Sequence, residues 1–358
     1  PIRDGGFVIW DRGKECVALN LSERSGDYRT LVAGADVLVE DFAPNSSRQN
    51  LVDRDWLADV NGRMINCSIT AYGKRGPLKD EPPVDDLVLA RMGVMGGMPG
   101  FRPAPVHIAH PLPSVGAAMF ADLGIAASLL ARETTGRGRS VETSLMAGAL
   151  LFHPKVTGEN VARHVFQTHP SGSAPFYSIY ECSDGNYVQL GCVHVRFMGV
   201  AAELMGIGDL VAEPRFDGGR GGTAENEAEL RDVLTRVMKT RTSPEWCEAF
   251  EAADVPFAPA GVTEDGMADP QVAHNNMVVT LDDPERGPVL QMGVPIMFGE
   301  TPGKVRGPRA VEAKDASSVD LPPLPKAASR SDKLDPPPLD GVRILEITNL
   351  IAGPTGGR

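Results

Sequence analysis

The segment between residues 107 and 122 holds the side chains best suited to covalent chemistry. Ser114 follows His107 and His110 in the proline-rich stretch HIAHPLPS. A serine can attack an acyl carbon only when a neighbouring base takes its proton, and either histidine could serve. The simpler interpretation is that Ser114 caps the helix that SVGAAMF begins, and that the two histidines are structural or solvated.

Two other segments have the composition of anion-binding sequences. The MGGMPG segment at 95–100 lacks the strand–GxGxxG–helix context of a dinucleotide site, so it predicts no phosphate cradle. Arg132, Arg137 and Arg139 surround the turn TTGRGR and could meet phosphates. Basic residues at a helix end also interact well with the helix dipole, which favours a solvated helix end here.

The overall composition is that of a globular protein and excludes several classes of function. The chain has 358 residues, of which 42% are hydrophobic and 23% charged, and its formal net charge is -12. This acidic balance argues against a nucleic-acid partner, because a phosphate backbone attracts clustered Lys and Arg. No apolar run approaches ~18 residues, so we expect no membrane partner.

The cysteines predict neither a disulfide framework nor a metal centre. Their number is odd and no CxxC pair occurs among Cys16, Cys67, Cys182, Cys192 and Cys247. Unpaired thiols suit a reducing compartment, so we expect a cytoplasmic location. The scattered Cys and His residues predict no metal site and no permanently bound cofactor.

Apolar strands alternate with helices through the first half of the chain. Strands are expected at Val17–Leu21, Ala35–Glu40 and Met64–Ser68, and near-continuous apolar runs of this kind are typical of parallel strands. Helices are expected at Ser22–Leu31 with Ser22 as N-cap, at Trp56–Val60, in a long stretch from Asp85, and at Ser114–Glu133. This alternation predicts an α/β class, with a doubly wound, Rossmann-like large domain.

The second half predicts a smaller α+β domain inserted into the large one. The segment FYSIYECSDGNYVQLGC at 176–192 has the pattern of a β-hairpin that turns at SDGN. Helices are expected at Leu230–Met238 and Pro244–Ala253, and extended chain at Val255–Val262 and Val289–Met297. We therefore place the large domain at 1–165, a linker and the small domain at 166–290, and a return to the large domain at 291–312.

Six segments in order resemble the class III CoA-transferases, the group of formyl-CoA transferase, carnitine CoA-transferase and the bile-acid-inducible proteins. They are GADVLVEDFAPN, INCSITAYGKRGP, GIAASLLARETTGRGRSVETSLMAGAL, FYSIYECSDGNYVQL, RTSPEWCEAFEAADVPFAPAGV and ADPQVAHNNMVV. After a proline-rich linker at 313–338, the segment at 339–358, which contains DGVRILEITNLIAGPTGG, resembles the family's first strand and turn. The chain thus looks like most of one family copy, without its first strand–helix unit, followed by the start of a second copy.

The resemblance implies an interlocked, dimer-type architecture, formed by a homodimer or by intramolecular pairing with the second copy. It also implies that coenzyme A is a substrate and moves from an acyl-CoA to a small carboxylic acid. In this family an Asp carboxylate attacks the donor thioester, and CoA passes through an aspartyl-CoA thioester.

The chain departs from the family at the reactive position, because the family's Asp falls on Ser114 and no Asp or Glu lies between His107 and Ala121. Racemases of this fold pair that Asp with a His, whose position falls on Asp85, so no independent racemase site is expected. The resemblance carries over better elsewhere. It implies CoA contacts for Asp41, Phe42 and Arg48, and it places Tyr72 near the thioester.

Three functions follow from this pattern. The first is a CoA-transferase in which this half lacks the usual Asp. The second is a non-catalytic structural or CoA-binding half of a fused protein. The third, ranked last, is an acyl-CoA hydrolase or acyltransferase that depends on Ser114.

Overall fold

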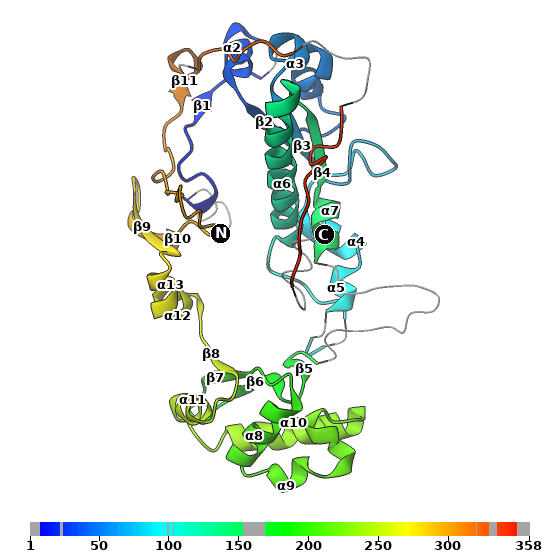
Figure 1. Ribbon diagram of the computed structural model, residues 1–358, viewed down its shortest axis with the longest axis vertical. Helices are drawn as coiled ribbons and strands as arrows, with labels where there is room; N and C mark the ends of the chain where they lie inside the picture. Colours follow the sequence, from blue (N-terminus) through cyan, green and yellow to red (C-terminus); the bar gives the residue numbers. More distant parts are fainter. Residues whose placement is uncertain are drawn as a thin grey trace. The chain divides into compact units, whose positions relative to one another are not determined.

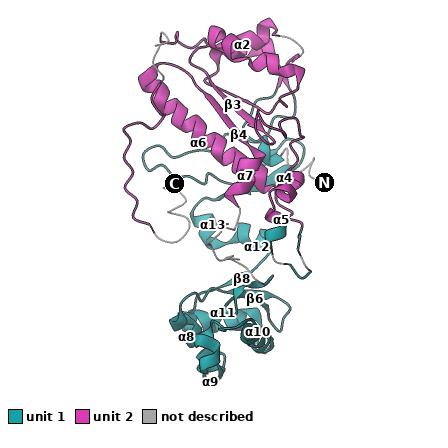
Figure 2. Cartoon of the chain, turned by 90° about the vertical axis from the view of Figure 1, so that its right-hand side faces the viewer, with its two compact units in different colours: residues 1–16, 95–106, 154–312 teal, residues 17–94, 107–153, 313–358 magenta. Residues whose placement is uncertain are grey.

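The computed structural model describes residues 8–21, 24–98, 100–102, 104–152, 169–319, 321–328 and 335–348. The chain forms two compact units (Figure 2). One, here called the parallel unit, comprises residues 17–94, 107–153 and 313–358. The other, here called the antiparallel unit, comprises residues 1–16, 95–106 and 154–312.

The parallel unit is built on three parallel strands in the order β2-β3-β4 (Figure 1). They are β2 (Val37–Glu40), β3 (Ile65–Thr70) and β4 (Ser140–Ser144). Cys67 of β3 lies opposite Val39 on one side and Val141 on the other. The two predicted apolar runs therefore form neighbouring strands, and the predicted α/β class is confirmed.

The first helices of this unit lie before and between the strands. They are α2 (Gly26–Gly34), the 3-10 helix η1 (Ser47–Val52) and α3 (Arg54–Val60). The side chain of Ser25 caps α2 by accepting the Tyr28 N–H, whereas the predicted cap Ser22 lies outside the described residues. Tyr28 and Val32 of α2 pack with Leu51 and Leu57 in one buried cluster.

The long helix predicted from Asp85 is instead two short ones, α4 (Asp85–Arg91) and α5 (Val94–Gly97). Gly93 separates them in the left-handed conformation, with φ at 74°. A residue with positive φ interrupts the helical hydrogen-bond ladder, and glycine adopts this conformation without strain. Gly93, which the sequence pattern placed inside one long helix, therefore separates two short helices.

Helix α6 (Leu112–Thr135) is followed by α7 (Leu145–Leu151), which packs against it. The helix begins at Leu112 with Pro111 as N-cap, so the prediction that Ser114 is the cap is wrong. A proline is tolerated in the first helical turn because its missing N–H has no partner there, and the helix therefore starts before Pro113. Gly136 ends the helix at φ 66°.

By length and composition alone, α6 could cross a membrane, contrary to the expectation that no segment is long and apolar enough. Gly116, Ala117, Ala121 and Ser128 on one side of it are nevertheless buried within the unit. A long apolar helix that packs on a parallel sheet has the same length and composition as a membrane-spanning helix. Length and composition therefore do not show that α6 crosses a membrane.

Residues 313–319 and 321–328 belong to the parallel unit. β11 (Lys314–Asp315) pairs in parallel with β1 (Val17–Ala18), and η3 (Ala316–Ser318) follows. Farther along, the Leu324 N–H donates to the Ala33 carbonyl. The first part of the predicted 313–338 linker is thus held against the unit by backbone hydrogen bonds. Residues 329–334 and 349–358 lie outside the described residues.

The antiparallel unit contains a four-stranded sheet in the order β5-β6-β7-β8 (Figure 1). Its strands are β5 (Gly172–Ala174), β6 (Tyr177–Glu181), β7 (Tyr187–Leu190) and β8 (Phe257–Ala260). β6 and β7 form the predicted hairpin. The helices of this part are α8 (Val195–Leu204), α9 (Gly208–Val211), η2 (Pro214–Gly219), α10 (Ala224–Met238) and α11 (Ser243–Ala252).

A buried core joins this sheet to its helices. Trp246 stacks on Phe250 with ring centroids 5.3 Å apart, and its indole N–H donates to the Met238 carbonyl at 2.8 Å. Phe176, Val188 and Leu230 belong to the same buried cluster. The predicted helices and strands of this domain are confirmed.

The unit continues through α12 (Thr263–Ala268) and α13 (Pro270–His274) into the hairpin of β9 (Val278–Asp283) and β10 (Gly287–Met292). Residues 291–312, predicted to return to the large domain, belong to the antiparallel unit instead. The physical reason is a set of contacts with the start of the chain, in which the Gly13 N–H donates to the Pro308 carbonyl and Gln291 donates to the Val8 carbonyl. The predicted boundary at 165 lies outside the described residues.

Candidate functional site

The carboxyl ends of β2, β3 and β4 meet at one edge of the parallel sheet, where Glu40, Thr70 and Ser144 are the last strand residues. In open α/β sheets, ligands bind outside this edge because the loops that leave the strands converge there. The candidate residues Asp41, Phe42 and Tyr72 directly follow the ends of β2 and β3. The fold therefore places them at the edge where a site is expected.

A buried ion pair joins the loops that follow β2 and β3. The side chain of Glu40 is only 2% exposed, and it accepts from the Lys74 ammonium at 3.2 Å and from the Phe42 N–H at 2.8 Å. The Lys74 N–H donates at 2.8 Å to the side chain of Glu142, a residue of β4. Sequence reasoning missed Glu40 and Lys74, although a charged residue at the end of an apolar strand is a visible signal.

The three residues implied in CoA binding lie on the loop after β2 and on η1. The Arg48 guanidinium lies over the Phe42 ring, 5.9 Å from its centroid. The Gln49 side chain holds the loop by donating to the Phe42 carbonyl at 2.9 Å. Asp41 and Arg48 are exposed. The structure thus brings Phe42 and Arg48 together in a position open to a ligand.

Tyr72 is buried after β3 and connects several elements. It packs in one cluster with Val88 of α4, Ala117 of α6 and Leu145 of α7. The Arg91 guanidinium lies 5.9 Å from the centre of its ring. Beside them is a cavity of about 320 Å³ lined by Tyr72, Glu81, Pro82, Leu87, Ala90 and Arg91. The lining carries one cation, Arg91, and one anion, Glu81, among mainly apolar groups. Such a cavity suits a small ligand with a few polar groups.

Ser114 is bound to a carboxylate on a neighbouring helix. Its backbone N–H donates to Oδ1 of Asp85 and its hydroxyl donates to Oδ2, both at 2.8 Å. Asp85 is the first residue of α4, and within the described residues its side chain makes no capping hydrogen bond to that helix. The Asp85 carboxylate instead accepts a backbone N–H from the first turn of α6. Sequence reasoning considered both positions but not their contact.

His107 and His110 are both exposed to solvent. His107 Nε2 lies 3.4 Å from Asp86 Oδ2, and both side chains are exposed. Within the described residues no hydrogen bond joins Ser114 to His107 or His110. The hydroxyl of Ser114 donates instead to the Asp85 carboxylate at the start of α4. This hydrogen bond holds the carboxylate in place.

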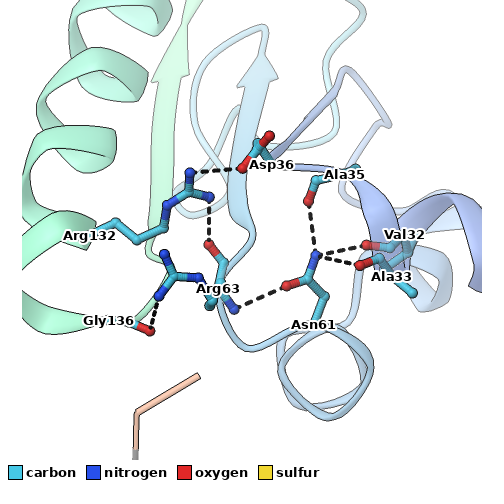
Figure 3. Close-up of polar contacts among 8 residues, drawn as sticks. All are labelled: Val32, Ala33, Ala35, Asp36, Asn61, Arg63, Arg132 and Gly136. Carbon is cyan, nitrogen blue, oxygen red and sulfur yellow. Dashed lines mark hydrogen bonds and ion pairs between the residues drawn. The ribbon is translucent and has the colours of Figure 1, made fainter. Parts of the chain in front are cut away.

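Arg132 lies at the opposite, amino edge of the sheet (Figure 3). Arg132 is buried and donates to Asp36 at 2.8 Å and to the Arg63 carbonyl at 3.2 Å. Asn61 donates to the carbonyls of Val32 and Ala35, both at 2.9 Å. The interpretation of this region as a solvated helix end is therefore wrong for Arg132, which ties α6 to the start of β2.

Within the described residues, no group of three or more His, Cys, Asp or Glu side chains is arranged to hold a metal ion. Burial raises the pKa of the Cys192 thiol to about 11, and burial is also the largest cause of the raised pKa of Cys67. Thiols in such environments stay protonated and are poor nucleophiles. The chemistry available at the carboxyl edge is that of carboxylates and their donors.

Comparison with known proteins identifies the family of the chain. The chain is 30% identical over 301 residues to an acetyl-CoA:oxalate CoA-transferase of Acetobacter aceti, covering 81% of this chain and 74% of that one. It is 26% identical to the beta subunit of a succinyl-CoA–L-malate CoA-transferase of Chloroflexus aurantiacus, covering 87% and 80%.

A solved structure of a CAIB/BAIF family protein from Brucella suis shares the fold, with a TM-score of 0.72 and 24% identity, covering 85% of this chain and 80% of that one. The family model described as CoA-transferase family III matches residues 3–310. The chain therefore belongs to CoA-transferase family III.

Proposed function

We propose that this protein is a CoA-transferase that moves CoA from an acyl-CoA to a small carboxylic acid. The match of the family model over residues 3–310 carries the proposal. The cavity beside Tyr72 and the Phe42–Arg48 pair, in which Arg48 is exposed, support it, because each places a guanidinium at the edge where ligands of such sheets bind. The substrates are an acyl-CoA and a small acid, and the protein works in the cytoplasm without nucleic acid.

The proposed route passes through an aspartyl-CoA thioester. An enzyme carboxylate attacks the acyl-CoA and forms a mixed anhydride, and the released CoA thiolate then attacks the enzyme carbonyl. This chemistry needs an ionised carboxylate close to donors that stabilise the developing oxyanion. Ser114 cannot take that part, because an acylated serine carries the acyl group and leaves CoA in solution.

The pairing of Ser114 with Asp85 disfavours a serine-dependent hydrolase or acyltransferase, since the hydroxyl has a carboxylate partner and no histidine base. A non-catalytic, CoA-binding or structural half of a fused protein is the remaining alternative. In both cases the interlocked pairing, with a second chain or a second copy, completes the assembly.

The proposed function is tested by CoA exchange. The full-length protein is mixed with acetyl-CoA or succinyl-CoA and with oxalate, malate or glutarate, and new acyl-CoA is followed by mass spectrometry. We expect exchange that hydroxylamine inhibits, because hydroxylamine cleaves an enzyme thioester. A protein that binds CoA but exchanges none of these pairs would favour the non-catalytic alternative.

Replacing Arg48 by alanine is expected to weaken CoA binding about fivefold to tenfold, the effect of losing one exposed charge contact of roughly 1 kcal/mol. Calorimetric titration with free CoA measures the dissociation constant. Arg29→Ala, which removes an exposed arginine of α2, is the matched control and should bind CoA as the wild type does. Equal affinities for both variants would remove Arg48 from the site.

A further inference from the structure

One carboxylate near the carboxyl edge of the parallel unit stands apart from the others. Glu40 is buried and already paired with Lys74, and Asp86 is exposed beside His107. Asp85 is half-buried, and within the described residues no basic side chain pairs with it. Among the described residues, Ser114 is the one donor to its two oxygens. Among these carboxylates, Asp85 is therefore the one that is partly shielded from water and, in the part of the chain that the structure describes, has no cation beside it.

We propose that Asp85 is the nucleophilic carboxylate of this chain and that Ser114 is the residue that positions it; the assignment rests on the proposed function. Oδ2 of Asp85 attacks the acyl-CoA carbonyl, forming a mixed anhydride and releasing CoA thiolate. The thiolate attacks the Asp85 acyl carbon, which forms the Asp85–CoA thioester and releases the donor acid. The acceptor carboxylate reverses both steps, so the new acyl-CoA leaves and the Asp85 carboxylate is restored.

The two hydrogen-bond donors of Ser114 lie beside the oxygens on which negative charge develops during these reaction steps. The backbone N–H at Oδ1 is fixed by the first turn of α6, so it stays on the oxygen that remains a carbonyl in the thioester. That oxygen becomes the oxyanion whenever the Asp85 acyl carbon is attacked, and a preorganised donor lowers the barrier. The hydroxyl at Oδ2 is on a rotatable side chain, so it can leave the attacking oxygen.

The helix behind Ser114 strengthens this environment. α6 has 24 residues, and the positive end of its dipole points at the Asp85 carboxylate. One turn farther along α4 and α6, Val88 and Ala117 pack against Tyr72, so the carboxylate lies in the neighbourhood of the predicted thioester residue. A serine at position 114 also suits a nucleophile at 85, because two carboxylates at hydrogen-bond distance cannot both stay ionised.

The deciding experiment locates the covalent intermediate. Full-length wild-type protein is incubated with the acyl-CoA that exchanges best, hydroxylamine is added, and the digested protein is sequenced by mass spectrometry. Hydroxylamine converts an aspartyl-CoA thioester to a hydroxamate with release of CoA. We expect the hydroxamate on Asp85, and a label on another residue would overturn the assignment while leaving the proposed function in place.

Variants give a second, independent reading. Asp85→Asn keeps an oxygen that can accept the Ser114 N–H, so its thermal melt should stay close to that of the wild type, and its exchange rate should fall at least ~1000-fold. Asp86→Asn is the matched control and should exchange normally. Ser114→Ala should lower kcat roughly 10- to 100-fold with KM little changed, and the hydroxamate should still form on Asp85.

The outcomes separate the two proposals. Exchange by Asp85→Asn within tenfold of the wild type would overturn Asp85 as nucleophile, and the search would move to a carboxylate of the second copy. Loss of the hydroxamate in Ser114→Ala with normal labelling in Asp85→Asn would also overturn it. A wild-type protein that neither exchanges nor becomes labelled would overturn the proposed function, and the assignment of Asp85 with it.

Discussion

Replacing Gly148 by alanine is expected to destabilise the parallel unit by about 3 kcal/mol, the cost of forcing extra volume into a packed helix contact. A Cβ at this position in α7 would lie 2.1 Å from the Pro113 carbonyl oxygen and 2.5 Å from the Ala117 nitrogen. Both atoms belong to the backbone of α6, so no side chain can turn away. The helices must separate.

The same change should reduce CoA exchange, because the atoms that it displaces flank Ser114. Moving the first turn of α6 changes the two 2.8 Å hydrogen bonds that hold Asp85. Chemical denaturation measures the free energy of unfolding, and the exchange assay gives the rate. Gly26→Ala is the matched control, since a Cβ at this first residue of α2 meets nothing within 4 Å. If the two variants proved equally stable, the close α6–α7 contact would be refuted.

The arrangement of Gly148 against α6 illustrates what the sequence cannot show. Strand β3 was predictable because a mostly buried parallel strand has a near-continuous apolar run. β2 has the same kind of run, although Val39 is exposed. The close helix contact depends on Gly116 and Gly148, which are 32 positions apart in one chain. Nothing local distinguishes them from the other small residues of their helices, since spacing reports only the face of a single element.

The candidate site divides in the same way. Phe42 and Arg48 lie together because one loop and one turn of helix separate them, and a short-range pattern can anticipate such a contact. Asp85 and Ser114 lie on different helices, and their contact depends on how α4 packs beside the start of α6. Because Pro113 is tolerated in the first turn, α6 begins before the predicted cap, Ser114. The Ser114 hydroxyl therefore does not cap its own helix and donates to Asp85 of α4.

Replacing Lys74 by methionine is expected to cost about 3 kcal/mol of stability, because it leaves the Glu40 carboxylate buried without its cation. Glu40 retains the Phe42 N–H as a partner, which offsets part of the loss. The side chain of Lys74 is 31% exposed, so some water reaches the pair, and we take the lower end of the usual range. Thermal and chemical unfolding measure the change.

Two further variants make the cause of this loss specific. Lys79→Met removes an exposed lysine from the same loop and should leave the free energy of unfolding within about 0.5 kcal/mol of the wild type. Glu40→Gln combined with Lys74→Met removes the buried charge, so the double variant should regain at least ~1 kcal/mol over Lys74→Met alone. Additive losses would instead mean that each side chain acts through separate contacts. A regain would show that the ion pair joins the β2 and β3 loops, and would explain why a lysine is needed beside a strand that is otherwise apolar.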